Sequence, residues 1–381
     1  MKWDIVTGEY PPQPGGVSDY TRQVASALAA GGDGIHVWAP PSGPSPASDD
    51  AVTVHRLPDR FGLRTIASLG RLAGPPRSDR RWLVQYTPQV FGWKAMNVPF
   101  CLWLSARGRA ETVWTMFHEV IYPFGRRQPL SHNVMAAVTR VTASLVARTS
   151  ARIFVSIPAW EPWLRRLAPG AGTITWLPIP SSIPSSPAPE AVALARKRFA
   201  PEPAQQVLGH FGTFGALVRV LLTAVLPPLL AADPRRIAVL VGRGGDAFVA
   251  ELRRAEPKLG GRVHATGGLA PGGVAAHLTA CDVLLQPYPD GVSSRRSSVM
   301  AGLALGLPIV TTRGFLTDPV WDTCGAVVLA PASSPPAFVH AVEAVLRDAD
   351  ERRRLRTQAA KLYAERFALE RTIEILRAAD D

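Results

Sequence analysis

Two adjacent arginines, Arg295 and Arg296, follow a turn-rich loop at the expected start of a helix. The loop holds one carboxylate, Asp290, and two serines, Ser293 and Ser294, that could cap the helix. A helix dipole disfavours cations in its first turn, and a guanidinium binds phosphate through two parallel hydrogen bonds. The pattern therefore predicts a site for a phosphate-bearing ligand, although two solvated arginines would give the same sequence.

A second candidate site is the stretch GEYPPQPGGVSDY, residues 8–20, between an expected strand and an expected helix. Gly15 and Gly16 have no side chains, so a diphosphate or a sugar could lie against the backbone at the helix N-terminus. A tight turn alone would also explain the two glycines. The stretch is not GxGxxG, and the chain has no GxxxxGK(S/T), so a nicotinamide or flavin cofactor and a P-loop nucleotidase are disfavoured.

Two further motifs lie at the ends of expected strands. His118 ends an apolar strand and is followed by Glu119. A histidine is usually a core or capping residue, but ligands of α/β domains approach the carboxyl ends of strands. Arg243 lies in the turn VGRGG, where it could contact a phosphate or a base, or only cover the turn.

Short apolar strands alternate with amphipathic helices along the chain, which predicts doubly wound α/β domains. Strands are expected over residues 2–8, 34–40, 82–88, 111–119, 151–157, 205–214, 236–245, 262–268, 282–289, 308–314 and 326–331. Helices are expected over residues 16–32, 133–150, 335–348 and 350–378, and irregular loops over 42–81 and 120–132.

A Pro- and Ser-rich stretch, PIPSSIPSSPAPE, interrupts this pattern near the middle and predicts a linker between domains. We expect an N-terminal domain over residues 1–180 and a C-terminal domain over residues 181–360. A last helix within residues 361–381 is expected to pack back toward the N-terminal domain.

The 381 residues carry a formal net charge of +12, and residues 1–180 hold 19 Lys and Arg against 11 Asp and Glu. This excess could serve nucleic acid, an anionic membrane or a phosphorylated ligand, or reflect an arginine-rich genome. Nucleic acid is disfavoured because basic and aromatic residues do not interleave.

The cysteines and the apolar segments limit the class of protein. Three scattered cysteines argue against a zinc cluster and a disulfide framework. No apolar run is long enough for a bilayer span, and the N-terminus lacks a signal pattern. We therefore expect a cytoplasmic protein, and its basic surface suggests peripheral contact with the inner membrane face.

These motifs together resemble the retaining glycosyltransferases of family 4, whose GT-B fold has two Rossmann-like domains facing a central cleft. The resemblance spans nearly the whole chain through PPQPGGVSDYTRQVASALAAGG, QYTP, FHE, LGHFGTF, VGRGG, DGVSSRRSSVMAGLALGLPIVTT and LYAERFALE. It implies transfer of a hexosyl unit from a UDP-, GDP- or dTDP-sugar to a hydroxyl of a glycan, a lipid-linked acceptor or a small molecule. It implies no metal and no cofactor.

The resemblance also implies roles for individual residues. His118 would lie beside the reacting sugar, and Asp290 is the second catalytic candidate. Asp19, Tyr86 and Glu119 would lie on the acceptor side. The donor would be bound by Gly15, Gly16, Val17, Gly212, Arg243, Gly291, Val292, Ser293, Ser294, Arg295 and Arg296, with help from the backbone amides of 291–294.

The sequence departs from the family pattern at its usual pair of glutamates, whose positions hold Ser293 and Ala301. Asp290 is the one nearby acid, three residues before the first of these positions. The family's basic pair after the first strand of the second domain is reduced to Arg219. We infer that the two adjacent arginines replace it, as in a subgroup with a DGxSxRR-type loop.

Two functions follow from this pattern. In the first, the arginines neutralise the departing diphosphate, the acceptor attacks on the same face of the sugar, and the leaving phosphate takes the acceptor's proton. In the second, the missing acidic pair marks a non-catalytic protein that binds sugar nucleotides or glycans.

Overall fold

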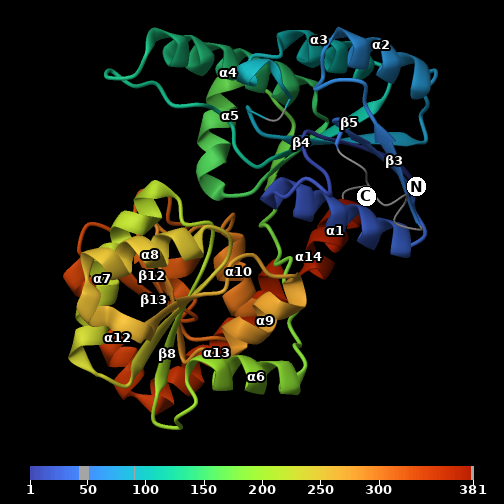
Figure 1. Ribbon diagram of the computed structural model, residues 1–381. Helices are drawn as coiled ribbons and strands as arrows, with labels where there is room; N and C mark the ends of the chain where they lie inside the picture. Colours follow the sequence, from blue (N-terminus) through green and yellow to red (C-terminus); the bar gives the residue numbers. More distant parts are fainter. Residues whose placement is uncertain (43–50, 90, 379–381) are drawn as a thin grey trace. The chain divides into compact units, whose positions relative to one another are not determined.

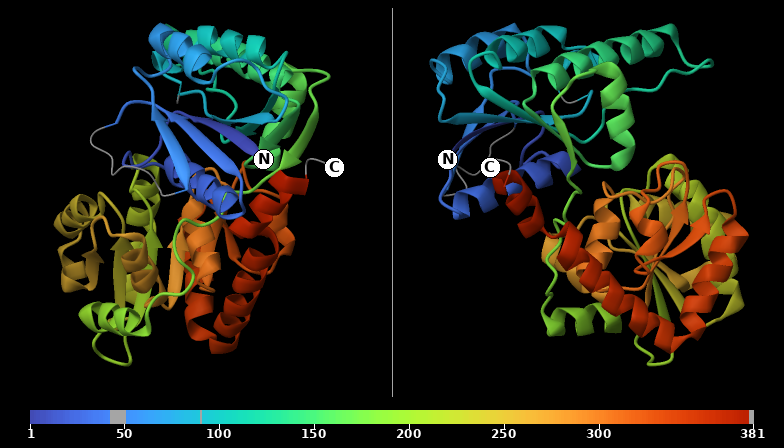
Figure 2. Two further views of the ribbon diagram at one scale, coloured as in Figure 1. Left: turned by 90° about the vertical axis from the view of Figure 1, so that its right-hand side faces the viewer. Right: turned by 180° about the vertical axis from the view of Figure 1, so that it is seen from behind.

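The computed structural model describes residues 1–42, 51–89 and 91–378. The chain divides into two compact units, one made of Met1–Pro178 with Thr372–Asp381 and the other of Ile179–Arg371. Each unit contains one parallel β-sheet with helices on both faces (Figures 1 and 2).

The first unit has a seven-stranded sheet in the order β3-β2-β1-β4-β5-β6-β7. Its strands are β1 (Lys2–Thr7), β2 (Gly34–Ala39), β3 (Val52–Arg56), β4 (Arg80–Tyr86), β5 (Thr112–Phe117), β6 (Arg152–Val155) and β7 (Thr173–Trp176). Its helices are α1 (Gly16–Ala30), α2 (Leu63–Leu72), α3 (Val98–Arg107), α4 (Leu130–Thr149) and α5 (Glu161–Leu167). Because helices cover both faces, the central strands β1 and β5 are buried along almost their whole length.

Helix α1 contacts β1 and β2 and buries Tyr20, Val24 and Leu28, which recur every four residues on one face. Helices α2 to α5 cover the other face of the sheet, where Phe100 and Val146 belong to one core cluster with the inner strands (Figure 1). This packing fixes the strand ends from which the candidate residues project.

The second unit has a six-stranded sheet in the order β10-β9-β8-β11-β12-β13. Its strands are β8 (Gln206–Phe211), β9 (Arg236–Val241), β10 (Val263–Ala265), β11 (Val283–Gln286), β12 (Ile309–Arg313) and β13 (Val328–Pro331). Its helices are α6 (Pro189–Phe199), α7 (Ala216–Ala232), α8 (Gly245–Ala255), α9 (Pro271–Thr279), α10 (Ser297–Ala304), α11 (Val320–Thr323), α12 (Pro335–Arg347) and α13 (Ala349–Leu362). Helix α14 (Leu369–Ala378) closes the described chain.

The predicted α/β class is confirmed, and the predicted strands agree with observed ones to within a few residues. The expectation of an irregular segment over residues 42–81 is wrong, because β3 and α2 lie there; residues 43–50 are outside the described ranges. Strand β3 is a half-exposed edge strand and α2 buries only Thr65 and Leu69, so neither has a clear apolar pattern. The expected helix over 350–378 is interrupted by a π-helical turn at Tyr363–Phe367.

Candidate active site

The predicted donor residues of the second unit lie at one edge of its sheet. Strands β8 and β11 are neighbours, and the sheet continues from them in opposite directions, to β9 and to β12. Ligands of doubly wound sheets bind outside the carboxyl ends of the strands at such a switch point. Gly212 follows β8, Arg243 follows β9 and the loop of residues 290–296 follows β11. The fold therefore brings these three segments to the same edge.

The helix after this loop begins later than predicted. It starts at Ser297, with Arg296 as its N-cap, so Arg295 and Arg296 precede the helix. Ser293 and Ser294 are fully buried and do not cap it. The predicted serine caps are wrong: the amide of Ser294 donates to a carboxylate from another segment, and residues 293–296 form a turn before the helix, closed by a hydrogen bond from the amide of Arg296 to the carbonyl of Ser293.

Both arginines are paired with the same carboxylate. Nη2 of Arg295 lies 3.1 Å from Oδ2 of Asp290, and Nη2 of Arg296 contacts Oδ1. The guanidinium of Arg296 also lies over the ring of Tyr288, 4.5 Å from its centroid. Both carboxylate oxygens therefore contact guanidiniums, so Asp290 occupies the cations that were predicted to bind the donor.

The loop is fixed to the end of β12 and to the residues directly after it. The amide of Val292 donates to the carbonyl of Thr312 at 2.8 Å. Gly291 has a φ of 89°, and a Cβ at this position would lie 2.3 Å from the backbone nitrogen of Gly314. Only glycine fits this close approach of two backbones.

Three backbone amides of the loop donate hydrogen bonds to other groups of the protein. Those of Gly291, Val292 and Ser294 donate to the carbonyls of Tyr288 and Thr312 and to a carboxylate. The expectation that the amides of 291–294 bind the donor is therefore wrong for these three. The predicted contribution of this loop to anion binding then rests on the side chains of the two arginines.

The turns after β8 and β9 approach each other closely. Gly242 has a φ of 127°, and a Cβ there would lie 2.1 Å from the carbonyl oxygen of Gly212. Arg243 is exposed in this turn. Arg219 instead pairs with Glu251 on α8, so the arginine nearest to the family's basic pair is engaged elsewhere.

His210, near the carboxyl end of β8, was not predicted. Its side chain is buried, Nδ1 bonds to the carbonyl of Leu285 at 2.7 Å, and Nε2 has no hydrogen-bond partner among the described residues. Burial lowers its pKa to about 4, so the imidazole is neutral. Its place at a strand end, like that of His118, is a signal that sequence analysis could have used.

In the first unit the switch point lies between β1 and β4. Gly15 is the N-cap of α1, and Gly16 and Val17 open the helix. A Cβ at Gly15 would overlap Oε2 of Glu9, whereas a Cβ at Gly16 meets nothing within 4 Å. Glu9 was not predicted; burial and the nearby charge of Asp19 raise its pKa. The helix start thus combines open space at Gly16 with two nearby carboxylates.

His118 follows β5 and is nearly buried. One ring nitrogen, Nε2, lies 2.8 Å from Oε1 of Gln85, and the ring meets that of Tyr20 edge-on at 5.0 Å. Burial lowers its pKa to about 3, so the imidazole is neutral at pH 7. A neutral imidazole can hydrogen-bond to a sugar hydroxyl but carries no extra proton to donate.

Tyr86 lies in the core of the first unit, in contrast to its predicted place on the acceptor side. It is 1% exposed, its hydroxyl lies 3.0 Å from that of Thr142, and its ring packs against Phe117. Its side chain therefore stabilises the sheet and is not presented to an acceptor. Glu119 is partly exposed beside His118.

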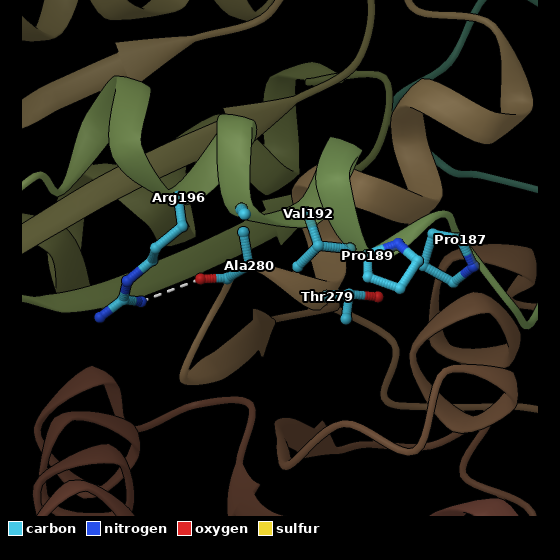
Figure 3. A pocket seen from close by; sticks show the side chains of 7 residues that line it. Pro187, Pro189, Val192, Arg196, Thr279 and Ala280 are labelled. Atoms are coloured by element: carbon cyan, nitrogen blue, oxygen red, sulfur yellow. Dashed lines mark hydrogen bonds between the residues drawn. The ribbon is translucent and has the colours of Figure 1, made fainter.

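A hollow in the surface lies away from these residues. Figure 3 shows it between α6 and α9, lined by Pro187, Pro189, Val192, Ala193, Arg196, Thr279 and Ala280. Arg196 donates to the carbonyl of Ala280 at 2.9 Å and to Asp282 at 2.8 Å, just before β11. The hollow therefore lies near the amino edge of the sheet, opposite to the loop of residues 290–296.

Within the described ranges, no group of three or more His, Cys, Asp or Glu side chains could hold a metal ion. No helix in the described part of the chain is long and apolar enough to cross a membrane.

Comparison with known proteins bears on both units. Residues 205–348 match the family model "Glycosyl transferases group 1". A search of curated proteins finds no significant match. Sucrose-phosphate synthase from Thermosynechococcus elongatus is 17% identical with a TM-score of 0.71, over 100% of this chain and 98% of that one.

Two further solved structures are similar over almost their whole length. HepE from Anabaena, solved with UDP-glucose, is 16% identical with a TM-score of 0.68, over 100% of this chain and 99% of that one. WaaG, a glycosyltransferase involved in lipopolysaccharide biosynthesis, is 16% identical with a TM-score of 0.64, over 98% of this chain and 99% of that one. At these identities the structures show the fold, which is GT-B, while the family match covers all six strands of the second sheet. The chain therefore has the GT-B fold, and residues 205–348 of its second unit are similar to the group 1 glycosyltransferases.

Proposed function

We propose that the protein is a retaining, metal-independent hexosyltransferase that uses a nucleotide diphosphate sugar as donor. The observation that carries this proposal is the pair of guanidiniums, Arg295 and Arg296, at the switch point of the second sheet. UDP-glucose is the first donor to test, because HepE was solved with it. The acceptor is a hydroxyl group, on a glycan, a lipid-linked molecule or a small molecule.

The proposed reaction begins when the donor's diphosphate replaces Asp290 on the two guanidiniums. Their charge stabilises the diphosphate as the bond between the anomeric carbon and the phosphate oxygen breaks. The acceptor oxygen bonds to the anomeric carbon on the same face, and its proton passes to the departing phosphate. His118 orients the sugar through its neutral imidazole, and the helix start at residues 15–17 contacts the donor.

A thermal-shift panel of UDP-, GDP-, ADP- and dTDP-sugars, run with EDTA, tests the donor. A ligand at 100 times its Kd adds about 2.7 kcal/mol of stability. Release of nucleotide from the best donor then measures turnover. If no sugar nucleotide stabilises the protein, the proposed donor class is wrong, and stabilisation without turnover would favour the non-catalytic alternative.

Substitution of both arginines tests the site itself. We expect R295A/R296A to lower turnover by about 10²–10³-fold, because the charge that stabilises the leaving diphosphate is lost. The matched control is K197A/R198A, an exposed basic pair on α6 that should leave turnover unchanged. Normal turnover in R295A/R296A would overturn the assignment.

We also propose that the acceptor is reached from the cytoplasm at an anionic membrane surface. Helices α2, α3 and α4 lie side by side on the first unit and form what we term the outer helical layer (Figure 1). This layer exposes apolar side chains, namely Leu63, Leu72, Leu102, Leu130, Val134 and Val141. Such side chains beside cations favour the boundary between headgroups and acyl chains.

The charge of this region supports the same proposal. Residues 60–160 hold 14 Lys and Arg against three Asp and Glu. Among the acids, Glu111 is buried and pairs with Arg107, and Asp79 pairs with Arg77. Arg126 and Arg127, just before α4, are exposed. Helices α2, α3 and α4 themselves hold five arginines and no Asp or Glu, so the outer helical layer and the loop before α4 are basic.

A further inference from the structure

Asp318 is a buried carboxylate for which the proposed reaction has no use. It lies between β12 and α11, and its side chain is 3% exposed. One oxygen, Oδ2, accepts hydrogen bonds from the amide of Ser294 and from Nε1 of Trp321 at 3.3 Å. The other oxygen, Oδ1, is buried without a hydrogen-bond partner among the described residues.

The surroundings of Asp318 make its charge costly. Burial raises its pKa to about 6, although the hydrogen bonds from Ser294 and Trp321 and the charge of Arg295 act in the opposite direction. Arg295 is the cation that acts on it, and Arg295 is in turn paired with Asp290. A side chain retained at such a cost calls for a role beyond filling space.

The contact with Ser294 lies directly before the two arginines. The carbonyl of Ser294 accepts a hydrogen bond from the amide of Ile179 at 3.1 Å, so both polar groups of this residue's backbone are held. We propose that Asp318 is a positioning residue: its carboxylate fixes the backbone at Ser294 and thereby the direction in which Arg295 and Arg296 point. This inference depends on the proposed function in one respect only, the identity of the ligand that the arginines bind.

Hydrogen exchange of the full chain without ligand tests the positioning directly. In D318A and D318L, we expect the amides of the peptide covering residues 290–296 to exchange about 10- to 100-fold faster, because a hydrogen bond to a charged group is lost. D318L fills the space of the aspartate and keeps the test possible if D318A does not fold. D318N retains an acceptor oxygen, so in this variant the amides of the same peptide should exchange at a rate within about threefold of that in the wild type.

A matched control separates positioning from loss of stability. Glu343 is a buried acid of the same unit that pairs with Arg236, far from the loop in sequence. E343Q should destabilise the unit without selectively accelerating exchange in residues 290–296. The proposal is overturned if D318A and D318L leave that peptide unchanged, or if they accelerate exchange equally throughout the second unit.

Turnover of UDP-glucose gives a second measurement. We expect kcat/KM to fall about tenfold or more in D318A and D318L and to recover in D318N. Equal losses in all three variants would contradict a role through the hydrogen bond to Ser294. If the wild type turns over no sugar nucleotide, the proposed function fails, while hydrogen exchange still decides the role of Asp318.

Discussion

Asp290 occupies the two guanidiniums that a donor's diphosphate is proposed to bind. In D290N the competing charge is removed while the size of the side chain is kept. We expect UDP to bind more tightly, by up to about tenfold, since Coulomb attraction between the arginines and the diphosphate is no longer offset. Isothermal titration measures this affinity, and D233N, an acid paired with Arg235, is the control. A fall in kcat of more than a hundredfold with unchanged affinity would instead restore a proton-transfer role to Asp290.

The pKa of Asp318 makes a prediction about stability and pH. Because burial raises this pKa from 3.8 to about 6, the folded chain takes up a proton at a higher pH than the unfolded chain. Proton uptake therefore stabilises the fold; this contribution is complete below pH 3.8 and is lost as the pH rises through about 6. Relative to the wild type, D318N should thus be more stable at pH 7.5, by about 1–3 kcal/mol, and should lose this advantage near pH 4. Urea unfolding at both pH values measures the difference, and a difference independent of pH would contradict the prediction.

Two residues show which parts of the candidate site can be predicted from the sequence alone. His118 ends an apolar strand, and a strand end is recognisable from local sequence. Asp318 belongs to no motif and lies 24 residues from the amide it binds. Its burial arises only when two segments pack together, so no local pattern could have singled it out.

At the scale of elements, the loop of residues 290–296 depends on one glycine. In G291A, the added Cβ would lie 2.3 Å from the backbone nitrogen of Gly314, at a φ of 89° that other residues rarely adopt. We expect a loss of at least about 1–3 kcal/mol of stability from the backbone conformation alone, together with weaker binding of UDP. Thermal unfolding and titration measure both effects. G261A, where a Cβ meets no atom within 4 Å, is the control, and equal behaviour of the two variants would count against this role of the loop.

Strands and helices were predictable where burial was complete. Strands such as β5 and β9 are nearly or fully buried along their length, so most of their residues are apolar. The start of α10 was misplaced because Ser293 and Ser294 followed by charged residues match the pattern of a helix start. A contact within the loop, with Asp290, and one from outside it, with Asp318, override that local preference.

At the scale of the whole molecule, the distribution of charge predicts contact with an anionic membrane. We expect R126Q/R127Q to bind vesicles of anionic lipid about 30-fold less tightly than the wild type, because each Lys or Arg near such a surface contributes about 1 kcal/mol. Co-sedimentation with anionic and zwitterionic vesicles measures the effect. K197Q/R198Q neutralises an exposed pair on α6 and should bind as the wild type does. Wild-type binding that does not depend on anionic lipid would refute the proposal.

Hydrogen bonding of the loop's amides within the protein has a consequence for how donor binding depends on dissolved salt. A phosphate site lined by peptide dipoles at short range is little affected by dissolved salt, whereas partly exposed charges are screened over a Debye length of about 8 Å at physiological ionic strength. Because three amides of the loop donate within the protein, the proposed attraction for the donor rests on side-chain charge. We therefore expect the strength of donor binding to follow ionic strength, with small anions in the medium acting as competitors for the arginines.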